Sequence, residues 1–331
     1  MMWDDRRRRR WSRTNRLIAE AAERMGARAE ELCDVHSDIL VRLVHGDRSV
    51  IIAKTRSPHL SAVSGVLANN KYASGELLKA AGVPVVPRVL VEDLTDAAQA
   101  RTASEALARW GTVVVKPNWR NRALGVVTRI EAPELMRDAV ALAVGVDVDG
   151  EALIEPYVGG KSLRVTVIGG RVAAACTIDH VCLRGDGNRT VQQLIDALNA
   201  DPRRGWYDEG ALTPLDCFEP DATWRATLAL RGLDLASPLP EGRVLDVVSE
   251  EAETTDVTDV LAPRWAAVAE QACRVLGVDV GGVDLIVDDP SGDEGVVLEV
   301  NCLPALHLHA MPTRGVARPV FDAFVAWCLK R

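Results

Sequence analysis

Two apolar stretches decide the fold of this chain: Gly282-Val-Asp-Leu-Ile-Val287 and Val296-Val-Leu-Glu-Val-Asn301. They predict buried strands over residues 283–287 and 295–300. Because side chains alternate along a strand, Glu299 and Asn301 point to one side, and Asp284 can share it if the strands pair. Two carboxylates and an amide oxygen are hard ligands of the kind that Mg²⁺ prefers. Three unrelated polar residues near strand ends are the alternative, but the set as a whole favours a metal site.

Two lysines upstream are candidates for binding phosphate. Lys116 ends the apolar stretch Thr112-Val-Val-Val-Lys116, which predicts a buried strand over residues 112–116. A buried ammonium needs an anionic partner, and a nucleotide phosphate would serve. A lysine whose packed stem lets its ammonium reach solvent fits equally well. Lys71, in Asn69-Asn-Lys71 at the start of an expected helix, could likewise bind phosphate or could belong to a plain exposed turn.

Further candidates lie between these two regions. Ile154-Glu-Pro-Tyr-Val-Gly159 predicts a strand that runs into an extended turn, whose backbone groups can read adenine or form an ordinary strand exit. Arg164 and Arg184 are candidates for binding a transferring phosphoryl group, because arginine binds phosphate oxygens bidentately. Each could also be a surface residue. His307 and His309 could line a substrate site or fill the core.

Composition narrows the class of protein. The 331 residues suggest about two domains, and 48% hydrophobic with 26% charged residues is typical of a globular protein. A net charge of −8 indicates no nucleic-acid partner, and the basic run Arg6 to Arg10 is interpreted as a solvated tail. No apolar run reaches the ~20 residues that span a bilayer. Seven cysteines without a C-x-x-C spacing argue against disulfides and zinc, so we expect a reduced, cytoplasmic protein.

Periodicity and turn residues predict the remaining elements. Helices are expected over residues 69–81, 98–110, 133–144, 190–199, 263–276 and 316–329. Strands are expected over residues 39–44, 49–53, 85–91, 125–130 and 152–155, with a hairpin over 162–177 that turns at Gly169-Gly170. Residues 201–256, rich in Pro, Gly and Asp, are expected to be irregular.

Taken in order, these stretches resemble the ATP-grasp ligases. The likeness is greatest to the glutathione-synthetase module of bifunctional γ-glutamate–cysteine ligase/glutathione synthetase, with cyanophycin synthetase a near relative, and it spans roughly Ser37 to Trp327. The segments that carry it are Leu67-Ala-Asn-Asn-Lys71, Val115-Lys-Pro-Asn-Trp-Arg-Asn-Arg-Ala-Leu-Gly-Val126, Glu155-Pro-Tyr-Val-Gly-Gly-Lys-Ser-Leu-Arg164, Gly282-Val-Asp-Leu-Ile286 and Leu298-Glu-Val-Asn-Cys-Leu-Pro-Ala-Leu-His-Leu-His309.

The resemblance implies an α/β (α+β) ATP-grasp fold in three subdomains, over residues 1–96, 97–158 and 159–331, with ATP between the central and C-terminal parts. It implies that two lysines contact the phosphates, that a loop covers them, that a hinge holds the nucleoside, and that two Mg²⁺ ions, or Mn²⁺, are bound. In this sequence the resemblance assigns the phosphates to Lys71 and Lys116 and the covering loop to the segment that holds Gly125. It assigns the nucleoside contacts to Glu155, Tyr157, Val158 and Ser162. The metal ligands would be Asp284, Glu299 and Asn301, and the catalytic arginines would be Arg164 and Arg184.

The implied activity is ATP-dependent ligation of an amino-acid carboxylate, perhaps a glutamyl γ-carboxyl, to the amine of another amino acid through an acyl-phosphate. Expected partners are small amino-acid or peptide substrates, and self-association is expected from relatives. A nucleotide-binding module without turnover and a ligase that extends a peptide end repeatedly are the alternatives. Two departures stand out: Arg120 and Ala123 replace small glycine-like residues in the loop, and glutamates over residues 247–256 replace small residues, which should change the amino acid accepted.

Overall fold

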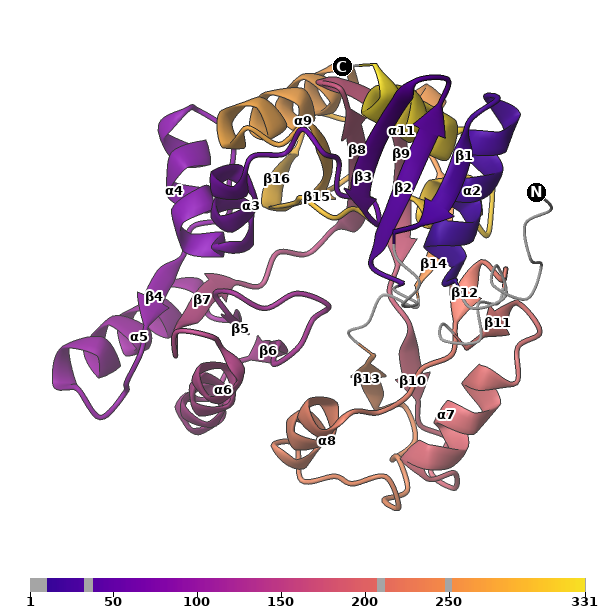
Figure 1. The fold of residues 1–331 in the computed structure, drawn as a ribbon. Helices are drawn as coiled ribbons and strands as arrows, with labels where there is room; N and C mark the ends of the chain where they lie inside the picture. The colour runs from indigo at the N-terminus through magenta and orange to yellow at the C-terminus, as the bar shows by residue number, and fades with distance from the viewer. Residues whose placement is uncertain (1–10, 33–37, 207–211, 248–251, 331) are drawn as a thin grey trace.

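The computed structural model describes residues 11–32, 38–206, 212–247 and 252–330 (Figure 1). The basic run Arg6 to Arg10 and two glutamates of the 247–256 stretch, Glu250 and Glu251, lie outside these ranges. None of the helices in the described ranges combines the length and apolar character that crossing a membrane requires.

The first layer joins the two ends of the described chain. Helix α2 (Arg13–Arg24) precedes an antiparallel sheet of β1 (Arg28–Glu31), β2 (Leu40–His45) and β3 (Arg48–Ala53). The predicted strands over 39–44 and 49–53 are confirmed to within one residue. Helix α11 (Val320–Leu329) packs on α2 and on this sheet, and it begins four residues later than predicted because Pro319 precedes it.

The helix predicted over residues 69–81 is present as α4, and a helix that was not predicted precedes it. Helix α3 (Ala62–Asn69) ends and α4 (Lys71–Ala80) begins around Asn70, which is extended at φ −89° and ψ 100°. The Asn70 side chain accepts a hydrogen bond from the backbone N–H of Ala73. The predicted helix is thus confirmed to within two residues, and it starts later because Asn70 is its N-cap rather than a helical residue.

The central sheet has the order β4-β7-β5-β6, with every neighbouring pair antiparallel. Its strands are β4 (Val89–Val91), β5 (Val113–Pro117), β6 (Val127–Ile130) and β7 (Ala152–Pro156), and it carries α5 (Ala97–Trp110) and α6 (Pro133–Val146). These elements share one apolar core. The strand predicted over 85–91 is shorter because Pro84 and Pro87 lack an N–H for the ladder.

The main sheet runs β14-β9-β8-β15-β16 and is also antiparallel. Its strands are β8 (Lys161–Ile168), β9 (Arg171–Asp179), β14 (Glu253–Asp256), β15 (Val280–Val287) and β16 (Gly295–Asn301). Helix α9 (Pro263–Leu276) packs on the sheet, and η2 (Thr258–Val260) and α10 (His307–Ala310) lie beside it. The hairpin predicted at Gly169-Gly170 joins β8 and β9, so this prediction is confirmed.

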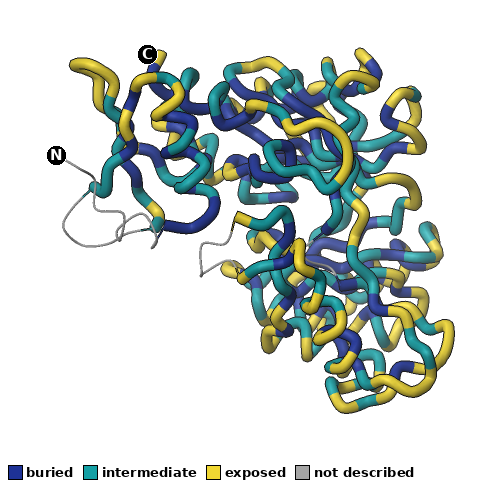
Figure 2. The backbone as a smooth tube through the Cα atoms, turned by 90° about the vertical axis from the view of Figure 1, so that its right-hand side faces the viewer, coloured by how far each residue is buried: buried dark blue, intermediate teal, exposed yellow. Residues whose placement is uncertain are grey.

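A small unit with its own core includes the helix predicted over residues 190–199, which is confirmed, and further elements from the region predicted to be irregular. Its elements are β10 (Cys182–Arg184), α7 (Val191–Asn199), β11 (Arg204–Gly205), β12 (Leu215–Asp216), α8 (Ala222–Ala229) and β13 (Val244–Asp246). In Figure 1 it hangs below the main sheet, and in Figure 2 exposed segments rim its buried interior. The prediction of an irregular region failed because these strands pair across long loops, as β10 does with β13.

Candidate nucleotide and metal site

Three oxygen-bearing side chains meet at adjacent strands of the main sheet. Asp284 on β15 lies directly opposite Glu299 on β16, and a bulge follows between Asp284 and Leu285. The Asn301 side chain donates hydrogen bonds to Asp284 Oδ2 (2.6 Å) and Glu299 Oε1 (3.3 Å). The alternation of side chains therefore placed the three residues correctly on one face. Their role as metal ligands stays a prediction.

Arg164 joins this cluster from the neighbouring strand. It stands opposite Asp284 in the β8–β15 register, and its guanidinium donates to Asp284 Oδ1 (2.6 Å) and Oδ2 (3.0 Å). A Cβ on Gly282 would lie 3.1 Å from Arg164 Cδ, so this glycine leaves room for the arginine. Burial raises the pKa of Asp284, and the Arg164 charge opposes that rise.

Lys71 brings a buried positive charge to the cluster. It is the first residue of α4, and its Nζ lies 3.8 Å from Glu299 Oε2. Burial lowers the pKa of Lys71 although Glu299 opposes the change. Burial alone would raise the pKa of Glu299, but the charges of Lys71 and Lys116 outweigh it and hold that pKa below its ordinary value. An anionic group is thus stabilised between these lysines.

Lys116 finds its anionic partner within the protein. Its Nζ lies 2.8 Å from Glu155 Oε2 across the β5–β7 pair, and both side chains are almost fully buried. The predicted need for an anion is met here by a carboxylate, which leaves the phosphate contact as a prediction. Glu155 also lies 3.3 Å from Arg88 Nε. Arg88 was missed by sequence reasoning, although a lone charge in the apolar stretch 85–91 could have indicated it.

The loop expected to cover the phosphates is held at its start. Asn118, 1% exposed, accepts a hydrogen bond from the N–H of Tyr72 and donates one to Glu151 Oε2 (2.6 Å). The N–H of Trp119 donates to Asp147 Oδ1 (2.7 Å). The Lys71 ammonium donates to the carbonyl of Arg120 in the same loop. The loop therefore rests on the start of α4, beside the carboxylate cluster.

The departure from a glycine-rich loop has a visible backbone consequence. Arg122 and Ala123 have φ of +57° and +54°, a left-handed conformation that costs a side chain roughly 1 kcal/mol or more. Gly125 follows at φ +73°, and a Cβ there would lie 2.6 Å from Val146 Cγ2 and 3.0 Å from Pro117 Cγ. Glycine is thus required at Gly125 for both conformation and packing.

The other predicted nucleoside contacts lie along one path from β7 to β8. The N–H of Tyr157 donates to the carbonyl of Thr112 (2.9 Å), and the guanidinium of Arg129 lies 4.6 Å from the Tyr157 ring centre. Val158 follows in the extended segment, and Ser162 is half-buried on β8 opposite Ile286. These positions lead from the central sheet to the main sheet.

The remaining candidates divide between the core and the surface. His309 is 1% exposed and bonds Thr166 Oγ1 through Nε2 (2.7 Å); burial and the Arg164 charge lower the pKa of His309 to about 3. Burial also lowers the pKa of His307. Arg184 is exposed on β10, and within the described residues its side chain makes no hydrogen bond or ion pair with the cluster. Its catalytic role stays a prediction.

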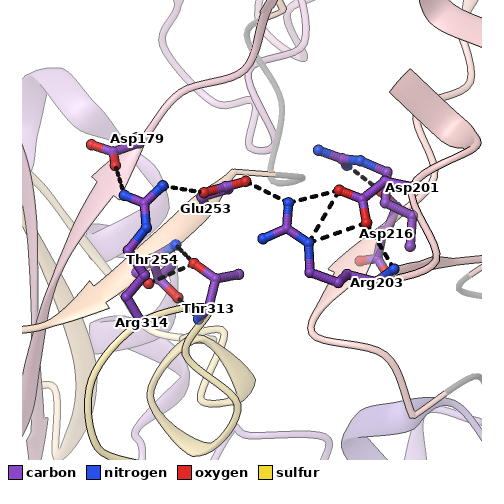
Figure 3. Close-up of polar contacts among 9 residues, drawn as sticks. Asp179, Asp201, Arg203, Asp216, Glu253, Thr254, Thr313 and Arg314 are labelled. Atoms are coloured by element: carbon purple, nitrogen blue, oxygen red, sulfur yellow. Dashed lines mark hydrogen bonds and ion pairs between the residues drawn. The ribbon is translucent and has the colours of Figure 1, made fainter. Parts of the chain in front are cut away.

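A second polar network holds the small unit against the main sheet (Figure 3). Glu253 on β14 pairs with Arg203 (2.7 Å) and Arg314 (2.7 Å). Arg314 also reaches Asp179 (3.3 Å), and Arg203 reaches Asp201 (2.6 Å). The network is partly exposed, so it fixes the position of the small unit more than it adds to the free energy of unfolding. Glu253 is one of the glutamates expected to alter substrate choice, and here its carboxylate is engaged in these two ion pairs.

Comparison with known proteins finds relatives in sequence and a solved structure with a similar fold. The chain is 28% identical over 317 residues to the cyanophycin synthetase of Nostoc sp. (92% of this chain, 34% of that protein). It is 28% identical over 306 residues to the bifunctional glutathione biosynthesis protein of Enterococcus faecalis (87% and 39%). The crystal structure of a bifunctional glutathione synthetase from Pasteurella multocida superposes with a TM-score of 0.60 at 22% identity, covering 97% of this chain and 44% of that one.

These likenesses confirm the resemblance and the ATP-grasp fold expected from the sequence. The chain spans about a third of the length of the relatives it matches in sequence. No family model matches it.

Proposed function

We propose that this chain is an ATP-dependent ligase that activates an amino-acid carboxylate and joins it to the amine of another amino acid. The observation that carries the proposal is the approach of Lys71 Nζ to Glu299 Oε2, at 3.8 Å. A triphosphate needs cations for its oxygens and a divalent metal beside them. Lys71 would provide the first and the carboxylate cluster would hold the second.

The donor set fits Mg²⁺. Asp284, Glu299 and Asn301 carry hard oxygen atoms and share one face, where the Asn301 amide nitrogen and Arg164 now bond the carboxylates; the side chains would turn their oxygens to a cation when one binds. Within the described ranges, no group of three or more His, Cys, Asp or Glu side chains is arranged to hold a metal. A cation here would therefore take further ligands from nucleotide phosphates and water, which is how Mg²⁺ commonly binds. We propose two such ions, with Mn²⁺ as a substitute. When bound, they would neutralise charge on the phosphates.

The chain's own residues would position the reactants. Lys71 and Lys116 would bind phosphate oxygens, and Arg164 would face the transferring phosphoryl group. The hinge around Glu155, Tyr157 and Val158 would hold the adenine, and Ser162 the ribose. The loop that ends at Gly125 would exclude water, which would otherwise hydrolyse the activated substrate.

The chemistry proceeds in two displacements. A carboxylate oxygen of the first amino acid attacks the γ-phosphorus of ATP, the bond to ADP breaks, and an acyl-phosphate forms. The nitrogen of a neutral amine then attacks the acyl carbon, phosphate leaves with the electrons of the C–O bond, and the nitrogen loses a proton. The products are an amide, ADP and phosphate.

A substrate screen tests the proposal. ADP release is measured with Mg²⁺ and the amino acids singly and in pairs, and products are identified by mass spectrometry. ADP together with a dipeptide supports the proposal, and ADP without any amide overturns it in favour of a phosphotransferase. Repeated mass additions to one acceptor would identify an iterative, peptide-extending ligase.

A nucleotide-binding module without turnover is the second candidate, and the strained, glycine-poor loop favours it. ATP binding measured by calorimetry, with no ADP from any pair, would establish it.

We also propose a cytoplasmic, self-associating protein with subdomains over residues 1–96, 97–158 and 159–331. Sedimentation measures the association, and limited proteolysis near residues 96 and 158 tests the boundaries.

A further inference from the structure

Arg88 is buried at the point where three elements of the candidate site meet. Its side chain is 2% exposed. One guanidinium nitrogen donates to the carbonyl of Lys71 (2.5 Å), and another donates to the carbonyl of Leu298 (3.2 Å). Its Nε lies 3.3 Å from Glu155 Oε1. The partners belong to α4, β16 and β7.

Each of these contacts is next to a residue with a proposed part in ATP binding. Lys71 itself accepts one hydrogen bond through its backbone, and Leu298 immediately precedes Glu299. Glu155 is the ion-pair partner of Lys116. The Arg88 guanidinium therefore contacts groups that adjoin both lysines and a proposed metal ligand. A guanidinium can make such contacts in several directions at once, because its donors diverge in a fixed, planar fork.

Helix α4 carries a glycine where the Arg88 side chain passes. A Cβ on Gly75 would lie 2.5 Å from Arg88 Nη1 and 2.7 Å from Cζ. Glycine inside a helix costs about 1 kcal/mol relative to alanine. Its presence four residues after Lys71 allows the guanidinium to reach the Lys71 carbonyl. This steric observation is independent of the hydrogen bonds, and it indicates the same position for the Arg88 side chain.

Charge supports the same interpretation. Lys71, Arg88 and Lys116 bring three positive charges to two carboxylates, those of Glu155 and Glu299. The Asp147 carboxylate also acts on Lys71, so the three positive charges are matched by three negative ones, and Arg88 is one of the groups that balance this set.

We propose that Arg88 is a positioning residue for ATP: it keeps Lys71, Glu155 and the strand that carries Glu299 in the arrangement that binds the triphosphate. The inference rests on the proposed function, because it concerns the same site. Arg88 would act through the groups it holds rather than through contact with the reacting atoms. Lysine cannot replace it fully, because an ammonium on a flexible stem does not reproduce the fork.

The test compares Arg88→Met and Arg88→Lys with Arg13→Met. Arg13 is a matched control, since its side chain is also 2% exposed and pairs with Asp216 (2.9 Å), a residue of the small unit, rather than with a member of the cluster. Dissociation constants for ATP with Mg²⁺ are measured by calorimetry, and melting temperatures are recorded in parallel. We expect Arg88→Met to weaken ATP binding about tenfold or more, the scale of one lost charge-assisted hydrogen bond. Arg88→Lys should fall between it and wild type, and Arg13→Met should lower the melting temperature without changing affinity.

Gly75→Ala provides a second route if Arg88→Met does not fold. Its new methyl group displaces the guanidinium while leaving the charge in place, so ATP binding should weaken although α4 gains a better helix former. In the Gly75→Ala/Arg88→Met double variant the methyl group has room, and the two losses should not add. Wild-type affinity in Arg88→Met or Gly75→Ala, or equal losses in Arg88→Met and Arg13→Met, overturns this inference alone. A wild-type protein that binds no ATP overturns the proposed function as well.

Discussion

Arg164 and Asp284 form a two-point hydrogen-bonded ion pair across neighbouring strands of the main sheet. Their side chains are 13% and 16% exposed. Removing one partner of such a pair leaves a buried charge without compensation, which costs far more than the pair contributes. The pair is therefore a test of how the candidate site is held together.

We expect Arg164→Gln to lower the free energy of unfolding by about 3 kcal/mol. Arg24→Gln, which breaks the exposed pair with Asp322, should cost less than about 1 kcal/mol. Adding Asp284→Asn to Arg164→Gln should recover part of the loss, because the orphaned carboxylate is then neutral. Urea unfolding of the four proteins measures these values, and equal costs for the two arginine variants would refute the expectation.

Lys116→Met should weaken ATP binding about 30-fold, equivalent to losing a charge-assisted hydrogen bond of about 2 kcal/mol. The variant also leaves Glu155, now without the Lys116 ammonium at 2.8 Å, facing the phosphates. Lys79→Met is the control, since Lys79 is exposed on the same helix as Lys71. Calorimetry with ATP and Mg²⁺ gives the affinities. A Lys116→Met protein that binds ATP as Lys79→Met does would show that Lys116 makes no nucleotide contact.

Gly125 and Gly150 have the same φ of +73°, so comparing their alanine variants separates the effect of packing on stability from the effect of backbone strain. A Cβ at Gly125 would contact Val146 at 2.6 Å, whereas a Cβ at Gly150 meets no atom within 4 Å. Both alanine variants carry the conformational cost, so Gly125→Ala should be less stable by about 1–2 kcal/mol more than Gly150→Ala. It should also speed tryptic cleavage after Arg120 and Arg122 in the loop. Equal stability and equal cleavage would mean that Gly125 does not anchor the loop.

Stability should fall in mild acid because of buried histidine. The folded state keeps His309 neutral, with its pKa lowered from 6.5 to about 3 by burial and by Arg164, whereas the unfolded chain protonates near 6.5. The contribution of neutral His309 to the free energy of unfolding is complete above pH 6.5 and is lost as the pH falls toward 3. Between pH 7.5 and 5 it amounts to about 2 kcal/mol at 1.36 kcal/mol per pH unit.

The variant His309→Gln isolates this contribution. Glutamine can still bond Thr166 but does not titrate, so the difference between urea unfolding energies at pH 7.5 and 5 should shrink by about 2 kcal/mol. His45→Gln, at an exposed hairpin position, should keep the wild-type difference. An unchanged difference in His309→Gln would show that this residue is not the acid-sensitive group.

Four of the five strands of the main sheet could be predicted because each shows its own alternation or apolar run, whereas the short, polar β14 (Glu253–Asp256) was expected to be irregular. The same period of two placed Asp284, Glu299 and Asn301 together before any contact was known. The strands of the small unit could not, because strands of two or three residues, such as β11 and β12, have no period of their own. They form only when distant segments pair, and no local pattern signals that pairing.

In the site, a charge within an apolar stretch could have indicated Arg88, but the partners of the buried charges could not be predicted. Arg88 bonds backbone carbonyls of α4 and β16, and any residue type supplies a carbonyl. The pairing of Lys116 with Glu155 follows from the β5–β7 register, which a sequence pattern does not fix. Asn70, by contrast, could have been recognised as a cap, because asparagine before a helical stretch favours that position.

The packing of α11 on α2 and the first sheet sets an order for folding during synthesis. Ile18 and Val41 share a cluster with Phe321 and Phe324, which leave the ribosome nearly three hundred residues later. Until then the early helix and hairpin lack the partner that covers their apolar faces. This layer is therefore completed only after α11 has been synthesised, and a chain stalled before residue 320 exposes an apolar surface that chaperones can bind.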